Sequence, residues 1–324
     1  MSEIISSRPE LLTPIDARVL MSWPFFSLAK SKRLTPIDFS MKDVSILVEA
    51  MPAHGMATIW DADVLIWVAT WFARAHDNGF AISRRIETTP YDILTFIGRG
   101  VGARDYARLK AALDRLQTTS IVTTLNAPSE RYRARFSWLN AWKERADHDG
   151  RPLGIELSLP EWLHACFADG AQLLAIDRGY FDLTGGLERW LYRLVRRHAG
   201  HQPEGWRFDL KHLHAKSGSL SPHKRFAFEL RDIVRRQSLP GYELGFEFTA
   251  DGRTLLAFAP CGKPCARAVD SLVLSGTRTI VLSGTPHFIE DSKQESKPSS
   301  GARDVENHAA APATIRRLAQ RGAP

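Results

Sequence analysis

The feature that most restricts the fold of this sequence is an order of predicted elements that occurs twice. Each half of the chain has the pattern of a helix, a strand, a short helix, a turn, a long helix and a hairpin. Apolar periodicity places these elements at residues 61–77, 81–86, 89–97, 103–117, 120–125 and 131–138 in the first half. In the second half it places them at residues 186–198, 206–208, 209–216, 221–237, 242–249 and 253–259. A fold that accounts for one half should therefore account for the other.

Cap and turn residues bound the predicted elements. Asp61 precedes the first helix as an N-cap. Thr89-Pro90 and Ser221-Pro222 both have a capping residue followed by proline at the first helical position. Asp251-Gly252 is a typical turn of a two-stranded hairpin. These signals make the repeated order more specific than apolar periodicity alone.

A helix-turn-helix followed by a hairpin is the order of a winged helix, in which the second helix of the pair enters the DNA major groove. We therefore predict an α+β, helix-rich fold of two tandem winged-helix domains, at residues 23–150 and 151–260. A flexible leader is expected at residues 1–22. Residues 261–324 are expected to be a poorly structured basic tail, because residues 290–312 are rich in Ser, Lys, Glu, Ala and Pro.

The charge of the chain favours a polyanionic partner. It has 43 basic and 36 acidic residues, for a net charge of +7, and arginine outnumbers lysine by 32 to 11. Residues 61–143 carry a net charge of +4 and residues 185–260 carry +5, whereas residues 144–184 between them carry −5. Arginine suits planar contacts to phosphate and guanine. Double-stranded DNA is therefore the expected partner.

The predicted helix at residues 221–237 carries the clearest candidate DNA-binding surface. Its apolar face contains Phe226, Leu230, Ile233 and Val234. The opposite face presents Lys224, Phe228, Arg231 and Arg235, and His223 and Arg225 lie at the helix start. The cations could contact phosphates or guanine, and Phe228 could contact a thymine methyl group. The alternative is that Phe228 packs under a wing or another domain.

The first half and the second hairpin supply the remaining candidates. One face of the predicted helix at 103–117 carries Arg104, Arg108 and Arg115, and Arg99 lies in the preceding turn. On the predicted first wing, alternate strand positions place Arg131, Arg133 and Arg135 on one side. Arg253 lies at the second hairpin tip. A solvated face and protection of a strand edge are the alternatives for these arginines.

Several other functions are not favoured by the sequence. His212 and His214 have the spacing of a metal-dependent nicking enzyme with Tyr242 as nucleophile, but on the predicted helix the two histidines would diverge. We expect no catalytic residue, metal or cofactor. Three cysteines do not form a disulfide framework, and no apolar run approaches the ~20 residues that a membrane helix needs, so we expect a cytoplasmic protein with no membrane partner.

Four long strings resemble the replication initiator protein A family of bacterial plasmids. They are WPFFSLAKSKR at residues 23–33, HGMATIWDAD at 54–63, PYDILTFIGRG at 90–100 and LTGGLERWLYR at 183–193. The resemblance covers about residues 20–260. It implies sequence-specific binding at a plasmid origin and recruitment of host replication proteins. We expect a host replication initiator and helicase as partners, and a homodimer as one candidate state. The alternatives that the residues leave open are a winged-helix transcriptional regulator and a DNA-nicking replication enzyme.

Overall fold

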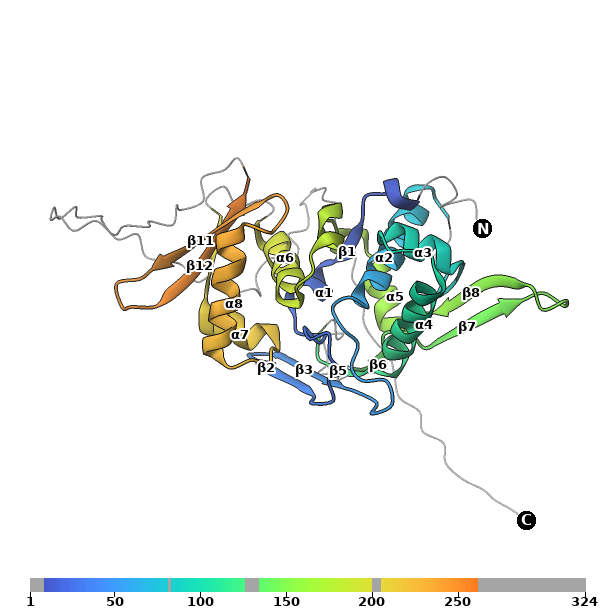
Figure 1. The fold of residues 1–324 in the computed structure, drawn as a ribbon, viewed down its shortest axis with the longest axis horizontal. Coiled ribbons are helices and arrows are strands. Elements are labelled where there is room, and N and C mark those ends of the chain that lie inside the picture. Colours follow the sequence, from blue (N-terminus) through green and yellow to red (C-terminus); the bar gives the residue numbers. More distant parts are fainter. Residues whose placement is uncertain (1–8, 81–82, 126–133, 200–204, 262–324) are drawn as a thin grey trace, which may run out of the picture. The chain divides into compact units, whose positions relative to one another are not determined.

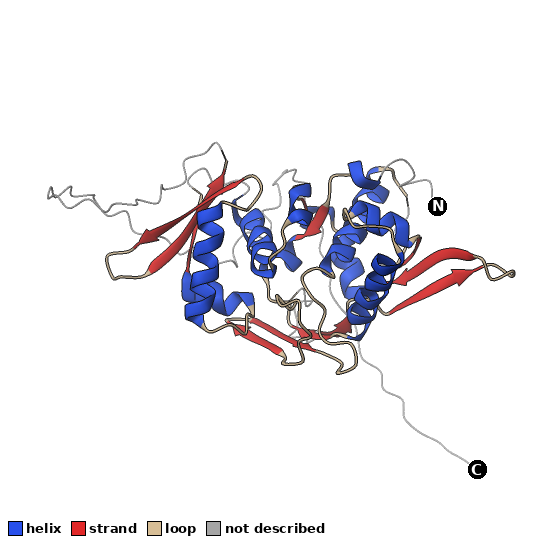
Figure 2. Ribbon diagram, in the orientation of Figure 1, coloured by secondary structure: helices blue, strands red, loops and turns tan. Residues whose placement is uncertain are grey.

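A computed structural model describes residues 9–80, 83–125, 134–199 and 205–261 (Figure 1). All of these residues belong to one compact unit, residues 1–270. The described residues form a mixed α/β fold with eight α-helices and four small antiparallel sheets (Figure 2). No helix in these ranges has the length and apolarity needed to cross a membrane.

The first half of the chain forms a unit that we call the first helix–hairpin unit. It consists of α2 (Ala62–Asp77), β4 (Arg85–Thr88), α3 (Pro90–Phe96), α4 (Ala103–Thr118), β7 (Ala141–Ala146) and β8 (Pro152–Ser158). Its three strands pair in the order β4-β8-β7. The β7–β8 hairpin extends beyond α4 (Figure 1).

The second half repeats this arrangement in the second helix–hairpin unit. It consists of α6 (Gly186–Ala199), β10 (Trp206–Asp209), α7 (Leu210–Ser217), α8 (His223–Arg236), β11 (Tyr242–Phe248) and β12 (Thr254–Pro260). Its strands pair in the order β10-β12-β11, so the strand between the first two helices again pairs with the second strand of the hairpin. The two units therefore share both element order and sheet topology.

Further elements connect the two units. They are η2 (Pro9–Leu11), β1 (Ile15–Ala17), α1 (Arg18–Ser22), β2 (Ile37–Met41), β3 (Val44–Glu49), β5 (Ser120–Thr123), β6 (Ala134–Ser137), α5 (Glu161–Ala168), η3 (Gly170–Gln172), β9 (Leu173–Ala175) and η4 (Arg178–Asp182). Strands β2, β3, β5 and β6 form a four-stranded sheet, and β1 pairs with β9. One cluster of buried apolar side chains contains residues of both units, among them Trp67, Leu109, Leu191 and Leu230.

Side-chain caps begin two of the described α-helices, α3 and α7, whereas the predicted cap Asp61 precedes α2 without a side-chain hydrogen bond to that helix. The Thr89 side chain accepts a hydrogen bond from the Asp92 backbone, and Asp92 accepts from Thr89 in return, which forms a capping box. Asp209 caps α7 in a similar way, through two backbone N–H groups. The predicted cap at Ser221 is wrong by one residue, because Pro222 occupies the N-cap position and α8 begins at His223 without a side-chain cap.

The hairpin of the first unit is not the one that we predicted. Strand β6 pairs with β5, and β5 pairs with β3 through Val48↔Ile121, so this hairpin completes the four-stranded sheet. The hairpin that joins β4 is β7–β8. Its strand β8 places Leu157 opposite Ile86 of β4, and both side chains are fully buried. This buried cross-strand pair stabilises the pairing of the β7–β8 hairpin with β4.

Two of the boundaries that we predicted fall on described residues. Within residues 1–22, for which we predicted a flexible leader, β1 and α1 contribute Ala17, Leu20 and Met21 to the core. The predicted boundary between residues 150 and 151 lies in the turn of the β7–β8 hairpin. The two-domain division and the basic tail stay predictions; apart from Cys261, the tail lies beyond the described residues.

Candidate nucleic-acid interface

The exposed face of α8 is the face that the sequence predicted. Lys224, Phe228, Arg231 and Arg235 are all exposed, whereas Phe226, Leu230, Ile233 and Val234 are buried. The Phe228 side chain is not packed under a hairpin, because the residue is 70% exposed. An exposed aromatic ring between cations gives this face both apolar and positively charged contact groups.

The cations of α8 differ in how far they are neutralised. Among the described residues, Lys224 and Arg231 have no carboxylate within 4 Å and form no hydrogen bond. Arg235 is hydrogen-bonded to Asp232, and this bond and that of Arg236 hold the pKa of the Asp232 carboxyl below its usual value. Arg225 Nε donates to Glu229 at 2.9 Å. Lys224 and Arg231 are therefore the two cations of this helix whose charge is not compensated in the described structure.

Hydrogen bonds from two side chains hold the turn before α8. Gly218 ends α7 with a φ of +62°, a left-handed conformation that favours glycine. Arg33 Nη1 donates to the Gly218 carbonyl at 2.7 Å. The His214 ring donates from Nε2 to the Ser221 carbonyl at 2.7 Å and makes an edge contact with the His223 ring. His223 is thereby placed at the exposed start of α8.

The arginines predicted on α4 divide into two groups. Arg104 and Arg108 are exposed, and Arg108 pairs with Asp105 at 3.5 Å. Arg115 instead forms two hydrogen bonds with Asp61, at 2.8 and 2.7 Å, and is 25% exposed. The bond to Asp61 raises the pKa of Arg115. Arg115 therefore connects α4 to the start of α2 rather than facing solvent with Arg104 and Arg108.

The predicted wing arginines have different surroundings. Arg131 and Arg133 lie outside the described residues. Arg135 is on β6 of the four-stranded sheet, where its Nη1 lies 3.2 Å from Glu49 and 2.9 Å from Ser120 Oγ. Arg253 is at the tip of the β11–β12 hairpin and donates from Nε to Asp251 at 2.7 Å.

Cations of the β7–β8 hairpin are paired with carboxylates. Lys143 lies 3.7 Å from Glu156, and Arg145 lies 2.6 Å from Glu87 of β4. Lys110 of α4 also reaches this hairpin, at 2.5 Å from Glu144. The hairpin that pairs with β4 therefore presents compensated charge, in contrast to the exposed face of α8.

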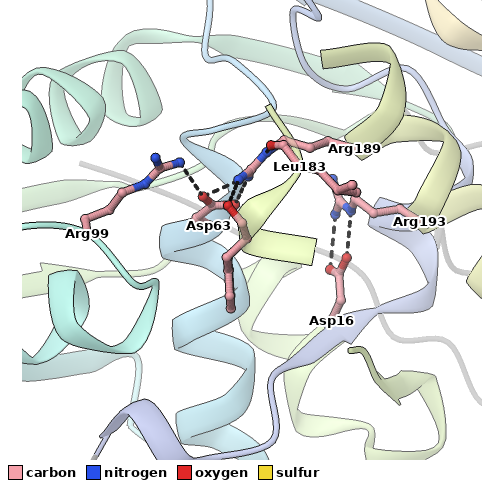
Figure 3. A network of polar contacts seen from close by, with 7 residues as sticks. Asp16, Asp63, Arg99, Leu183, Arg189 and Arg193 are labelled. Atoms are coloured by element: carbon pink, nitrogen blue, oxygen red, sulfur yellow. Dashed lines mark hydrogen bonds and ion pairs between the residues drawn. The ribbon is translucent and has the colours of Figure 1, made fainter. Parts of the chain in front are cut away.

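A buried network of charges, which we did not predict from the sequence, joins the two units (Figure 3). Arg189 of α6 donates from Nη1 to both carboxylate oxygens of Asp63 in α2, at 2.7 and 2.9 Å. Arg193, one turn further along α6, donates to Asp16 at 2.7 and 3.1 Å. Arg189 also donates to two backbone carbonyls. The pairs fix the position of α6 against α2 and β1.

Arg99 links this network to the surface. Its Nη2 lies 3.8 Å from Asp63 Oδ2, and its side chain is 42% exposed (Figure 3). Burial raises the pKa of Asp63 to about 6, although Arg189 and Arg99 act in the opposite direction. A sequence signal for the network did exist: Arg189 and Arg193 are spaced by four residues in a helix rich in large apolar side chains, and Asp63 lies within an apolar helix.

A DNA-nicking enzyme would use His212, His214 and Tyr242, and all three side chains pack against residues of the second unit. His212 stacks on Phe208 with ring centroids 5.6 Å apart, whereas His214 contacts Phe226. Tyr242 is buried, and burial raises the pKa of its hydroxyl. A nucleophilic tyrosine reacts as its phenolate, and a raised pKa lowers the fraction of phenolate near neutral pH.

Two comparisons with known proteins match this chain to proteins of DNA replication. A family model described as replication initiator protein A matches residues 15–244. A protein of Wigglesworthia glossinidia brevipalpis named as a replication protein is 30% identical over 237 residues, which are 71% of this chain and 84% of that protein.

Two solved structures of RctB domains 2 and 3 have a similar fold. A crystal structure of domains 2 and 3 of RctB superposes with a TM-score of 0.54 at 15% identity, over 78% of this chain and 98% of that chain. A second structure of RctB domains 2–3 has a TM-score of 0.50 at 16% identity, over 76% and 97% of the two chains. The likeness in fold extends over two domains of the matched protein.

Proposed function

The chain belongs to the replication initiator protein A family, and from this premise we propose that it starts plasmid replication by binding double-stranded origin DNA through two winged-helix domains. The single observation that carries the proposal is the exposed face of α8. There, Lys224 and Arg231 keep uncompensated charge on either side of the exposed ring of Phe228.

The shared topology of the two units supports the winged-helix interpretation. In each unit a short helix and a longer helix follow the first strand, and a hairpin then pairs with that strand. The fold match to two domains of RctB supports a two-domain arrangement. In this proposal α7 and α8 form the helix-turn-helix of the second domain, and α3 and α4 form that of the first.

The second domain supplies direct readout of base sequence. Arg231 suits a bidentate contact to guanine, and Phe228 suits the methyl group of thymine. His223, Lys224 and Arg225 lie at the start of α8, where recognition helices meet DNA, and Arg235 extends the same face. Replacement of an arginine that reads a base should weaken specific binding far more than nonspecific binding.

The first domain contributes mainly backbone contacts. Arg104 and Arg108 are the exposed cations of α4, and Arg99 extends from the preceding turn. Phosphate contacts position a protein on the duplex without reading its sequence. If both domains engage one duplex and neutralise roughly 6–10 phosphates, log K against log salt should have a slope of roughly −5 to −9.

The proposal includes the location and the partners of the initiator. The initiator would act in the cytoplasm, without catalytic residues or a cofactor, and would recruit a host replication initiator and a helicase to the bound origin. A homodimer is one state in which it would bind. The packing of His212, His214 and Tyr242 supports a role without DNA nicking.

The test of the proposal is footprinting of the full chain on DNA flanking its own gene. We expect protection of a defined site, and we expect a plasmid carrying that site to replicate only when the protein is supplied. A defined footprint without dependent replication would favour the transcriptional regulator. Strand breaks in supercoiled origin DNA with Mg²⁺ or Mn²⁺ would favour the nicking enzyme.

A further inference from the structure

A short basic run lies between the two helix–hairpin units, in the segment that connects α1 to β2. Lys30, Lys32 and Arg33 fall within a segment, from Trp23 to Ile37, that contains no acidic residue. Lys30 and Lys32 are exposed, whereas Arg33 is buried. The run therefore combines one anchoring cation with two cations at the surface.

Arg33 anchors this run to the second unit. Its guanidinium donates to the carbonyls of Thr35 and Pro36 and, from Nη1, to that of Gly218 in the turn before α8. A groove of about 660 Å³ lies next to this turn, and Leu28 and Ala29 line it together with Arg225 and Phe228 of α8. The basic run thus lies directly beside the helix proposed to read DNA.

The two exposed lysines extend toward the first unit. Lys30 Nζ lies 5.3 Å from the ring centroid of Trp60, and Lys32 Nζ donates to the Ala53 carbonyl at 2.8 Å. The loop that contains these partners contacts the end of α4, where Ala57 N–H donates to Thr119 Oγ1 at 2.8 Å. Lys30 and Lys32 are therefore positioned between the start of α8 and the end of α4.

Both lysines are held in place by neutral groups. An aromatic ring and a carbonyl orient the ammonium groups without cancelling their charge. Neither ammonium has a carboxylate within 4 Å in the described part of the chain. Lys110 and Lys143 of the first unit differ in this respect, because Glu144 and Glu156 compensate them.

We propose that Lys30 and Lys32 contact phosphates of the DNA backbone where the duplex passes between the two units. This inference rests on the proposed function and adds a contact segment that belongs to neither helix-turn-helix. A cation without a carboxylate partner can neutralise a DNA phosphate and release its counterion. Each phosphate neutralised changes the slope of log K against log salt by about −0.9. The contact is indifferent to base sequence.

The test compares two double variants of the full chain with the same change in net charge. The double variant Lys30→Gln with Lys32→Gln should flatten the slope of log K against log salt by about 2 units. The ratio of its affinity for origin DNA to its affinity for unrelated DNA should not change. Ethylation of phosphates between the two protected regions should cease to interfere with binding. The control, Lys110→Gln with Lys143→Gln, should leave the slope near that of the wild type. Thermal unfolding of both variants verifies that they fold.

Three outcomes would overturn the inference. Equal slopes for the test variant and the control would mean that Lys30 and Lys32 do not contact phosphate. Loss of plasmid replication with an unchanged salt slope would assign the two lysines to a protein partner. Failure of the wild-type chain to bind origin DNA at all would overturn the proposed function and, with it, this contact.

Discussion

In α4 of the first unit, Arg115 forms two hydrogen bonds with Asp61, whereas in α8 of the second unit Arg231 has no partner among the described residues. The hairpins do not share this difference, because Lys143 and Arg145 of β7 are paired with carboxylates and so is Arg253 at the tip of the β11–β12 hairpin. The contrast therefore lies in the long helices α4 and α8 of the two copies of one topology. The first unit uses several of them to hold its own elements together, and the second leaves key cations available to a ligand.

The difference teaches that topology and net charge do not identify a DNA-reading surface by themselves. Both units are basic in sequence, and both contain the helix and hairpin order of a winged helix. What separates one candidate cation from another, within each unit, is whether a carboxylate lies within reach: Arg231 has none among the described residues, whereas Arg235 is paired with Asp232. An ion pair with protein must be broken, or its acid displaced, before the cation can take a phosphate.

The largest loss of stability is expected from the buried charge network that joins the two units. Arg189→Ala would leave the Asp63 carboxylate buried without its main partner, which costs about 3–5 kcal/mol in the free energy of unfolding. Urea unfolding at pH 7 measures this loss. The control Arg225→Ala removes only an exposed pair with Glu229 and should change stability within experimental error. Similar losses for both variants would mean that the network contributes little.

The next effect tests the role of Arg115 in the first unit. Arg115→Ala should lower the free energy of unfolding by about 2–3 kcal/mol, because the nearly buried Asp61 would keep only its hydrogen bond from Thr58 N–H. The affinity of the folded protein for origin DNA should not change. A large loss of affinity without a loss of stability would place Arg115 on the DNA and remove the contrast between the units.

For Arg231 in the second unit we expect the opposite result, a loss of DNA affinity without a loss of stability. Arg231→Ala should cost about 1–3 kcal/mol in binding to the specific site and much less on unrelated DNA, if the guanidinium holds a base edge. Urea unfolding should be unchanged, since the side chain is exposed. Equal losses on both DNAs would identify a phosphate contact, and no loss would identify a solvated face.

The smallest effect concerns pH and Asp63. Its pKa in the folded chain is about 6, raised by burial from 3.8. Since the folded state binds this proton more tightly, the stability from protonation of Asp63 is present at low pH and is lost as pH rises through 6. Between pH 7 and pH 5 the wild type should gain about 1 kcal/mol relative to Asp63→Asn. A constant difference between the two proteins would contradict the raised pKa.

Much of the fold could be predicted from local signals. The capping box at Thr89 and the cap at Asp209 locate two helices, and apolar periodicity locates α8 and its exposed face. These features depend on residues that are neighbours in sequence. For this reason helical periodicity alone was enough to predict the candidate face of Lys224, Phe228, Arg231 and Arg235.

Features that depend on distant residues were missed or misplaced. Strand β7 was not predicted, since Ala141–Ala146 has only one large apolar residue, Trp142, and the choice of hairpin depends on burial against β4. The arginines Arg115 and Arg189 lie on predicted helices, but the carboxylates that hold them are 54 and 126 residues away. Periodicity along one helix contains no information about such partners.

The pairing of β1 with β9 and of Asp16 with Arg193 has a consequence for the order in which this protein folds during synthesis. The two partners of the ion pair are 177 residues apart in the chain. At a translation rate of about 5–20 residues per second, Asp16 is synthesised roughly 10–35 s before Arg193. Until Arg193 has been made, the Asp16 carboxylate lacks the partner that compensates its charge in the folded chain. The start of the chain can therefore adopt its final position only after α6 has emerged, so that translation itself sets when the two units are joined.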